Sequence, residues 1–292
     1  MFIIVDSGAT GCKWKFVSDE GRGVDEVVLG GINFAHQAGD LEAALGEEGF
    51  KSLEDTILRH PDVGRVFFYG AGIIAREGER IPAVMKDVDA FFERYYPGSE
   101  REYASDLLAA ARAVCGHGKG IAAILGTGSN SCLYDGKAIV SNVHSSGYIL
   151  GDEGSGVALG RDFMADFLKG LVPEGLAAGF ASEFKADYLT VVENVYKGPR
   201  PAAYLSSFAP WIMHHYESSP YVRELAEENF RRFVRRCLRQ YDTDRYEVGV
   251  VGGFGKANEA VLRKVFAEEG VAVSSITASP LEGLMEYHSH GV

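Results

Sequence analysis

The sequence FIIVDSGATG, residues 2–11, runs from four apolar residues into an aspartate and then into small residues around a glycine. The apolar run predicts a buried strand, and the residues after it predict a tight turn. Two interpretations of the turn are open from this stretch alone. It is either an ordinary hairpin or a loop whose backbone N–H groups bind a phosphate, which glycine permits because it has no Cβ.

The same pattern returns in IAAILGTGSNSCLYDGKAIV, residues 121–140. An apolar strand again leads into a turn of small residues, and two further strand-like segments follow, as they do at 13–17 and 24–29 in the first copy. A shift that places Gly8 on Gly128 also places Trp14 on Tyr134. We therefore predict a duplicated domain, with a boundary in the flexible stretch GHGKG, residues 116–120.

A third glycine turn, residues 252–255, follows the strand predicted at 246–251. Each turn alone is weak evidence, but three in one chain, two of them in duplicated positions, favour a nucleotide ligand. The chain has no GxxxxGK[ST] motif, and no GxGxxG follows the first strand, so neither a P-loop nor a dinucleotide-binding domain is indicated. Between the turns, apolar spacing predicts helices at 53–59, 82–95, 105–115, 157–168, 183–195, 202–216, 220–241, 259–269 and 281–288, with short strands at 66–69 and 271–274.

Composition limits the function classes. The chain has 292 residues, enough for one large domain or two medium ones, and its net charge of −12 argues against a nucleic-acid partner. No apolar run approaches the ~20 residues of a membrane span, and no leader precedes the first strand, so we expect a cytoplasmic protein without a membrane partner. The cysteines form no CxxC pair, which predicts neither a zinc site nor a disulfide framework: Cys12, Cys115, Cys132 and Cys237.

Several polar residues have both a structural and a functional interpretation. Asp6 either caps the first turn or contacts Mg²⁺ beside a bound phosphate. Asp106, after a capping Ser, either complements a helix dipole or does chemistry. Asp152 in GDEGSG and Asn33 in GGINF are equally ambiguous. The arginines of residues 231–239 indicate a solvated helix face or an oligomer contact, which leaves a homodimer open.

Six motifs in one order resemble the acetate and sugar kinase, heat-shock chaperone and actin superfamily: DSGAT, GGIN, SDLLAAARA, LGTGSNS, GDEGSG and VVGGFG. The resemblance is to its N-acetylglucosamine kinase branch, which is grouped with the activator ATPases of benzoyl-CoA reductase and hydroxyacyl-CoA dehydratase. It implies an α/β fold of two duplicated ribonuclease H-like (actin-like ATPase) domains with a nucleotide cleft between them. The implied domains are 1–117, 118–278 with a helical insertion, and a C-terminal helix in 279–292 that packs back on the N-terminal domain.

The resemblance also implies residue roles. Asp106 matches the catalytic base, which also contacts the sugar, and the other sugar contacts match Asn33, Ser129, Asn130 and Asp152. Nucleotide contacts match the two phosphate motifs and the adenosine motif: Asp6, Ser7, Gly8, Ala9, Thr10, Gly126, Thr127, Gly128, Gly252, Gly253 and Gly255. Asp6 is also the expected Mg²⁺ contact.

The implied activity is ATP-dependent phosphorylation of a sugar hydroxyl, the 6-hydroxyl by resemblance, on N-acetylglucosamine or a related amino sugar or hexose. The sugar stays open, because Ser146 stands where several N-acetylglucosamine kinases have an aromatic residue. Two alternatives also stay open: an activator-type ATPase that acts on a partner enzyme, and a non-catalytic sugar sensor.

Overall fold

The computed structural model describes residues 1–8, 11–31, 41–74 and 79–289. The chain divides into two compact units. The first comprises Met1–Gly118, Asp135–Ile139 and Ser279–Val292, and the second comprises Lys119–Tyr134 and Val140–Ala278. Among the described residues, no helix is both long and apolar enough to cross a membrane.

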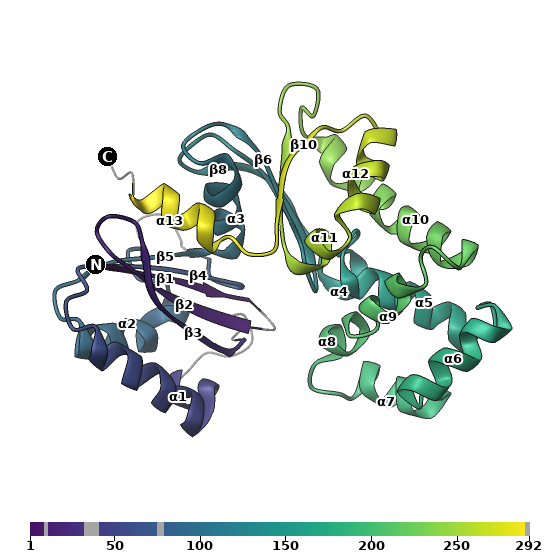
Figure 1. The fold of residues 1–292 in the computed structure, drawn as a ribbon, viewed down its shortest axis with the longest axis horizontal. Helices are drawn as coiled ribbons and strands as arrows, with labels where there is room; N and C mark the ends of the chain where they lie inside the picture. Colours follow the sequence, from purple (N-terminus) through teal and green to yellow (C-terminus); the bar gives the residue numbers. More distant parts are fainter. Residues whose placement is uncertain (9–10, 32–40, 75–78, 290–292) are drawn as a thin grey trace. The chain divides into compact units, whose positions relative to one another are not determined.

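The first unit is built on a five-stranded sheet of order β3-β2-β1-β4-β5 (Figure 1). The first three strands form an antiparallel meander, and the last two run parallel to β1: β1 (Phe2–Ser7), β2 (Gly11–Val17), β3 (Gly23–Gly30), β4 (Arg65–Gly70) and β5 (Glu100–Ser105). Strand β1 is apolar on both faces because helices cover both. Ile3 and Val5 pack toward α1 (Leu41–Arg59) and α2 (Lys86–Tyr95), and Phe2 and Ile4 pack toward the opposite face.

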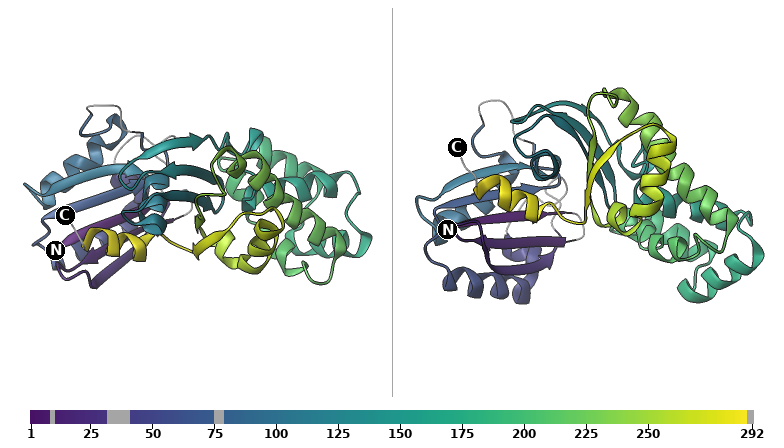
Figure 2. Two further views of the ribbon diagram at one scale, coloured as in Figure 1. Left: turned by 90° about the horizontal axis from the view of Figure 1, so that it is seen from above. Right: turned by 45° about the horizontal axis from the view of Figure 1, so that its top comes forward.

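That opposite face carries two helices that are distant in sequence, α3 (Asp106–Cys115) and the C-terminal α13 (Leu281–Ser289). Figure 2 shows α13, in yellow, beside the first strands, and α13 also contacts α3. Leu281 and Leu284 are buried there against β1 and Tyr69 of β4. Glycine allows the close approach, because a Cβ at Gly283 would lie 2.3 Å from the carbonyl oxygen of Ala113.

The second unit repeats the strand order of the first. Its sheet runs β10-β9-β6-β7-β8, with the same antiparallel meander and the same parallel additions: β6 (Gly120–Leu125), β7 (Ser129–Tyr134), β8 (Ile139–Val143), β9 (Val248–Val251) and β10 (Val273–Thr277). The fold prediction of two duplicated α/β domains is thus confirmed. The predicted alignment of the two copies, which placed Gly8 on Gly128, was wrong. The β1–β2 pairing ends at Ser7 with Cys12, and the β6–β7 pairing ends at Leu125 with Ser129. Gly8 is therefore equivalent to Gly126, the residue that follows the strand, and not to Gly128.

Helices fill the segment after β8, most of them packed in a core cluster separate from that of the second sheet. They are α4 (Gly147–Leu150), α5 (Gly156–Leu168), α6 (Glu174–Phe184), α7 (Tyr188–Tyr196), α8 (Pro201–Ser206), α9 (Ala209–His214) and α10 (Pro220–Arg236), and α11 (Gly253–Ala257) and α12 (Glu259–Glu268) follow β9. The helices predicted at 183–195 and 202–216 were wrong as single elements. The first is interrupted at Lys185, whose φ of 49° ends α6, and Asp187 then caps α7.

Two further predictions need correction. The sequence EREYAS did not predict β5, because this strand lies at the edge of the sheet and buries only Tyr103 and Ala104. Residues 252–255 are not a free turn: Gly252 ends the strand with φ 136° and Gly253 begins helix α11. Both errors arise where tertiary contacts override local pattern.

The close packing of α13 can be tested through two helical glycines. Gly283→Ala is expected to lower the free energy of unfolding by about 1–3 kcal/mol, because the new methyl group overlaps the backbone of Ala113. Gly175 of α6 has no atom within 4 Å of its Cβ position, so Gly175→Ala is expected to be neutral or stabilising by about 0.5–1 kcal/mol. Urea unfolding of both variants is the measurement, and equal stability would contradict the close approach of α13 to α3.

Candidate functional site

Two carboxylates mark one edge of the first sheet. Ser7, Gly70 and Ser105 are paired in one row across β1, β4 and β5, so the carboxyl ends of these parallel strands are level. Asp6 precedes this row and Asp106 follows it, as the first residue of α3. The carboxyl edge of parallel strands is where ligands bind in open α/β sheets.

Asp106 is held in place by helix capping. The Ser105 hydroxyl accepts a hydrogen bond from the Leu108 N–H at 3.2 Å, and Asp106 Oδ1 accepts one from the Leu107 N–H at 2.9 Å. This is the geometry that the helix-dipole interpretation predicts. It does not compete with a catalytic role, because a carboxylate that accepts a backbone N–H keeps lone pairs for further partners.

The electrostatics of the pair distinguish it from an ordinary helix start. Burial raises the pKa of Asp6 to about 6; the Asp106 carboxylate contributes to that increase and Lys13 opposes it. Burial also raises the pKa of Asp106, against the stabilising N–H of Leu107. Two like charges kept near each other and away from water favour a proton or a cation at this edge.

The pair fits Mg²⁺ better than a protein-only metal site. Within the described ranges, no group of three or more His, Cys, Asp or Glu side chains could hold a metal ion. Mg²⁺, however, is commonly held by one or two carboxylates, together with water and substrate phosphates. Asp6, the predicted Mg²⁺ contact, has the donor type and the negative charge for that role.

The first glycine loop is only partly described. Ser7 is buried at the end of β1, and the Gly8 N–H donates to the Gly11 carbonyl at 2.9 Å. That bond closes the turn, so this N–H is not the free donor that the phosphate-loop hypothesis assumed. Three predicted site residues, Ala9, Thr10 and Asn33, lie outside the described residues.

The second glycine loop is fixed by the start of helix α5. The carbonyl of Gly126 accepts from the Gly156 N–H at 3.0 Å, and that of Thr127 accepts from the Val157 N–H at 2.9 Å. As in the first loop, the glycine that follows the strand closes the turn, here through the Gly126 N–H and the Gly128 carbonyl at 2.9 Å. The carbonyl groups of the loop therefore point into the protein.

The structure brings the third glycine segment against this loop. A Cβ at Gly252 would lie 2.4 Å from the carbonyl oxygen of Leu125, and one at Gly255 would lie 3.2 Å from the Leu125 side chain. Glycine is thus required where the two backbones meet. The predicted nucleotide residues of the second unit therefore lie close together: Gly126–Gly128, Gly252, Gly253 and Gly255, of which Gly255 is buried.

Asp152 adjoins the same loop. Its Oδ1 accepts a hydrogen bond from the Ser129 N–H at 3.0 Å, and a Cβ at Gly128 would lie 3.0 Å from that oxygen. Burial raises the pKa of Asp152, while the Ser129 N–H opposes the increase. Its φ of 56° is unusual for a residue with a side chain. Such strain is found preferentially at functional sites.

The neighbouring Asn130 has a fixed amide orientation. Its Oδ1 accepts from the Ser131 N–H at 2.9 Å and from Asn142 Nδ2 at 2.9 Å. Because a backbone N–H can only donate, the accepting atom is the oxygen, and Nδ2 of Asn130 is the atom left to bind a ligand oxygen. Asn142 was not predicted as a site residue, since no local motif marks it in β8.

A solved structure covers the whole chain and identifies its family. The chain is 36% identical to a proposed N-acetylglucosamine kinase from Porphyromonas gingivalis; the match covers 100% of this chain and 99% of that one, with a TM-score of 0.89. The chain belongs to the N-acetylglucosamine kinase family. The family resemblance inferred from the six motifs is thereby confirmed.

More distant structures share the fold of this family member. A proposed N-acetylglucosamine kinase from Chromobacterium violaceum is 18% identical over 98% of both chains, with a TM-score of 0.73. A ROK family glucokinase from Streptomyces griseus, in complex with glucose and AMPPNP, is 18% identical over 98% of this chain and 97% of that one, with a TM-score of 0.56.

Sequence comparison with curated proteins gives a partial match. A stretch of 154 residues is 25% identical to 8-amino-7-oxononanoate synthases of Cupriavidus taiwanensis and Cupriavidus necator. It spans 52% of this chain and only 38% of the synthases, so it does not describe the two-unit fold. No family model matches the chain.

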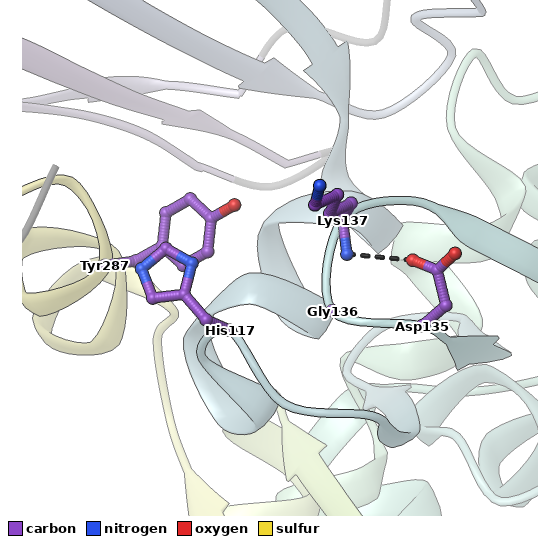
Figure 3. A pocket seen from close by; sticks show the side chains of 5 residues that line it. All are labelled: His117, Asp135, Gly136, Lys137 and Tyr287. Atoms are coloured by element: carbon purple, nitrogen blue, oxygen red, sulfur yellow. Dashed lines mark hydrogen bonds between the residues drawn. The ribbon is translucent and has the colours of Figure 1, made fainter. Parts of the chain in front are cut away.

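A cavity of about 550 Å³ lies elsewhere in the first unit (Figure 3). His117 stacks on Tyr287 at 4.2 Å on one side, and the hairpin Asp135–Lys137 lies on the other. None of its lining residues was predicted as a site residue.

The arginines of α10 have a structural role: Arg231 and Arg235 pair with Glu269 of the same unit.

The raised pKa of Asp6 predicts a pH-dependent stability. Between its ordinary pKa of 3.8 and about 6 the folded state holds a proton that the unfolded state releases, so stability is lost as pH rises through this window. Asp6→Asn removes the buried charge and is expected to raise the free energy of unfolding at pH 7 by about 1–3 kcal/mol. The gain should vanish near pH 4.

Urea unfolding between pH 4 and 8 checks this prediction, with Asp62→Asn as the control because Asp62 is exposed. An Asp6→Asn variant that is no more stable than the native protein at pH 7 would contradict the electrostatic account of the carboxylate pair.

Proposed function

We propose that this protein is an ATP-dependent sugar kinase that phosphorylates the 6-hydroxyl of N-acetylglucosamine or of a related amino sugar or hexose. The observation that carries the proposal is the pair of half-buried carboxylates, Asp6 and Asp106, at the carboxyl edge of the first sheet, each with a raised pKa. Family membership supports the same reaction class. The glucose-bound and AMPPNP-bound neighbour is consistent with it, although that likeness concerns the fold alone.

The nucleotide role is assigned to the glycine segments. In the second unit the phosphates would contact the N–H groups of Thr127 and Gly128, since the Gly126 N–H closes the turn. The segment from Gly252 to Gly255 would contact the adenosine part. In the first unit, the family resemblance assigns a further phosphate contact to Ser7, Gly8, Ala9 and Thr10. ATP supplies the phosphoryl group that is transferred.

The acceptor role is assigned to residues with complementary hydrogen-bonding groups. The oriented Asn130 amide would donate to a sugar oxygen, and the Asp152 carboxylate would accept from a sugar hydroxyl. Ser129 and Asn33 complete the proposed set. A sugar hydroxyl both donates and accepts, so it can satisfy an amide donor and a carboxylate acceptor together.

Asp106 is the proposed general base. Its carboxylate would accept the proton of the 6-hydroxyl as that oxygen forms its bond to the γ-phosphorus and the bond to the leaving ADP oxygen breaks. A base with a raised pKa is better matched to neutral pH than an ordinary aspartate. Asp6 would hold Mg²⁺, which supplies charge stabilisation to the phosphates. The remaining catalytic effect in phosphoryl transfer comes from positioning and electrostatic stabilisation.

The cysteines give no support to the activator-type alternative. Activators of that group carry an iron–sulfur cluster, which requires thiolate ligands. Cys12 lies beside the first loop, but it is buried, and burial raises the pKa of its thiol to about 11. A thiol in that environment stays protonated at neutral pH.

Asp106→Asn tests the assignment of the base. Sugar-dependent ADP release is expected to fall by about 10²–10⁴-fold, because the variant cannot accept the proton, while the Kd for ATP stays near that of the native protein. The native enzyme should lose kcat/KM as pH falls through the raised pKa of Asp106. The measurements are a coupled ADP assay and calorimetric ATP titration.

The control for this test is Asp55→Asn, which neutralises an exposed carboxylate on α1. An Asp106→Asn enzyme that retains native turnover on its best sugar would contradict the role of the base.

A further inference from the structure

One buried side chain of helix α10 binds the backbone of the loop that carries Asp152. Asn229 is only 1% exposed, in the interior of the helix. Its Oδ1 accepts from the Gly154 N–H at 2.9 Å, and its Nδ2 donates to the Ser155 carbonyl at 3.0 Å. Both partners are backbone groups, so the amide orientation is fixed. Both hydrogen-bonding ends of this amide serve one loop.

Two more residues of the same helix face hold the same loop. Phe233 packs beneath Gly154, where φ is 76° and a Cβ would lie 2.7 Å from the Phe233 Cβ. Arg236 pairs with the buried Glu153, with Nη1 and Oε1 2.7 Å apart. The spacing of four and three residues places Asn229, Phe233 and Arg236 on one face of the helix. This face fixes three successive loop residues.

The loop passes this restraint to Asp152. The Ser155 hydroxyl donates to the Asp152 carbonyl at 2.5 Å, and the Ser155 N–H donates to the same oxygen at 3.2 Å. Asp152 is thereby kept at its positive φ, with its carboxylate against the Ser129 N–H. Without the Asn229 amide, the Gly154 N–H and the Ser155 carbonyl would be buried without these partners, and the loop would relax to satisfy them.

We infer that Asn229 is a positioning residue for the acceptor sugar: by fixing Gly154 and Ser155 it sets the place of the Asp152 carboxylate. The inference rests on the proposed function, in which Asp152 contacts the sugar. A purely structural role for Asn229 would affect stability and leave the affinity for the sugar unchanged. The two roles therefore differ in a measurable quantity.

Asn229→Ala is expected to raise the KM for N-acetylglucosamine about ten- to a hundredfold, because small displacements of a binding group are costly. The KM for ATP should change much less, since the carbonyls of Gly126 and Thr127 are held by α5. Hydrogen exchange in a peptide covering residues 151–156 should become faster. Val222→Ala is the matched control, because Val222 is fully buried on the same helix but packs in a different core cluster from Phe233.

Arg236→Gln provides a second, milder variant, because the Arg236 side chain is 63% exposed and a glutamine can still donate a hydrogen bond to Glu153. It should raise the same KM by a smaller factor. If Asn229→Ala fails to fold, a native KM for the sugar in Arg236→Gln overturns the inference and a raised one supports it.

Failure of the inference is distinguishable from failure of the proposed function. A native protein without sugar-dependent ADP release overturns the proposed function, and the inference falls with it. A native protein that is active, with variants that exchange faster in the loop and yet keep the native KM for the sugar, overturns the inference alone.

Discussion

The structure depends on keeping two carboxylates, Asp6 and Asp106, together at the carboxyl edge of the first sheet. Burial and mutual repulsion raise the pKa of Asp6 to about 6. A charged Asp6 therefore lowers the stability of the folded protein at neutral pH, and nothing in the folding of the sheet requires it. The strand order that places β1 between β2 and β4, and β4 beside β5, is what brings the two chain segments to one row. A bound cation would relieve the repulsion, so the ligand-free protein is less stable there than it could be.

The second unit uses the same strand order for a different task. The first N–H groups of α5 donate to the carbonyls of its glycine loop, and Gly252 packs against the backbone that enters the loop. Asp152 accepts a hydrogen bond from the Ser129 N–H, where the loop ends. Helix α10 then fixes the loop that carries Asp152 through Asn229 and Arg236. Helix α10 thus restrains the loop, and the loop restrains Asp152, which is the proposed ligand contact. Preorganisation of this kind reduces the free energy lost on binding.

The sequence predicted what repeats locally and missed what depends on distant partners. The two strand–turn–strand copies were found because apolar runs and glycines recur at one spacing, although Gly8 corresponds to Gly126 and not to Gly128. The catalytic interpretation of Asp106 was favoured only through the family resemblance, since its cap is that of any helix. Asn229 lies in a segment that was predicted only as a helix; its partner Gly154 is 75 residues away, and no local pattern encodes that contact.

The most direct test of the central claim is the product formed from ATP, Mg²⁺ and a panel of amino sugars and hexoses, identified by phosphorus NMR spectroscopy. The account predicts stoichiometric ADP and a sugar phosphorylated at its 6-position, with N-acetylglucosamine or a close relative as the best acceptor. ADP released at the same rate without any sugar, or a sugar that binds and is recovered unphosphorylated, would contradict it.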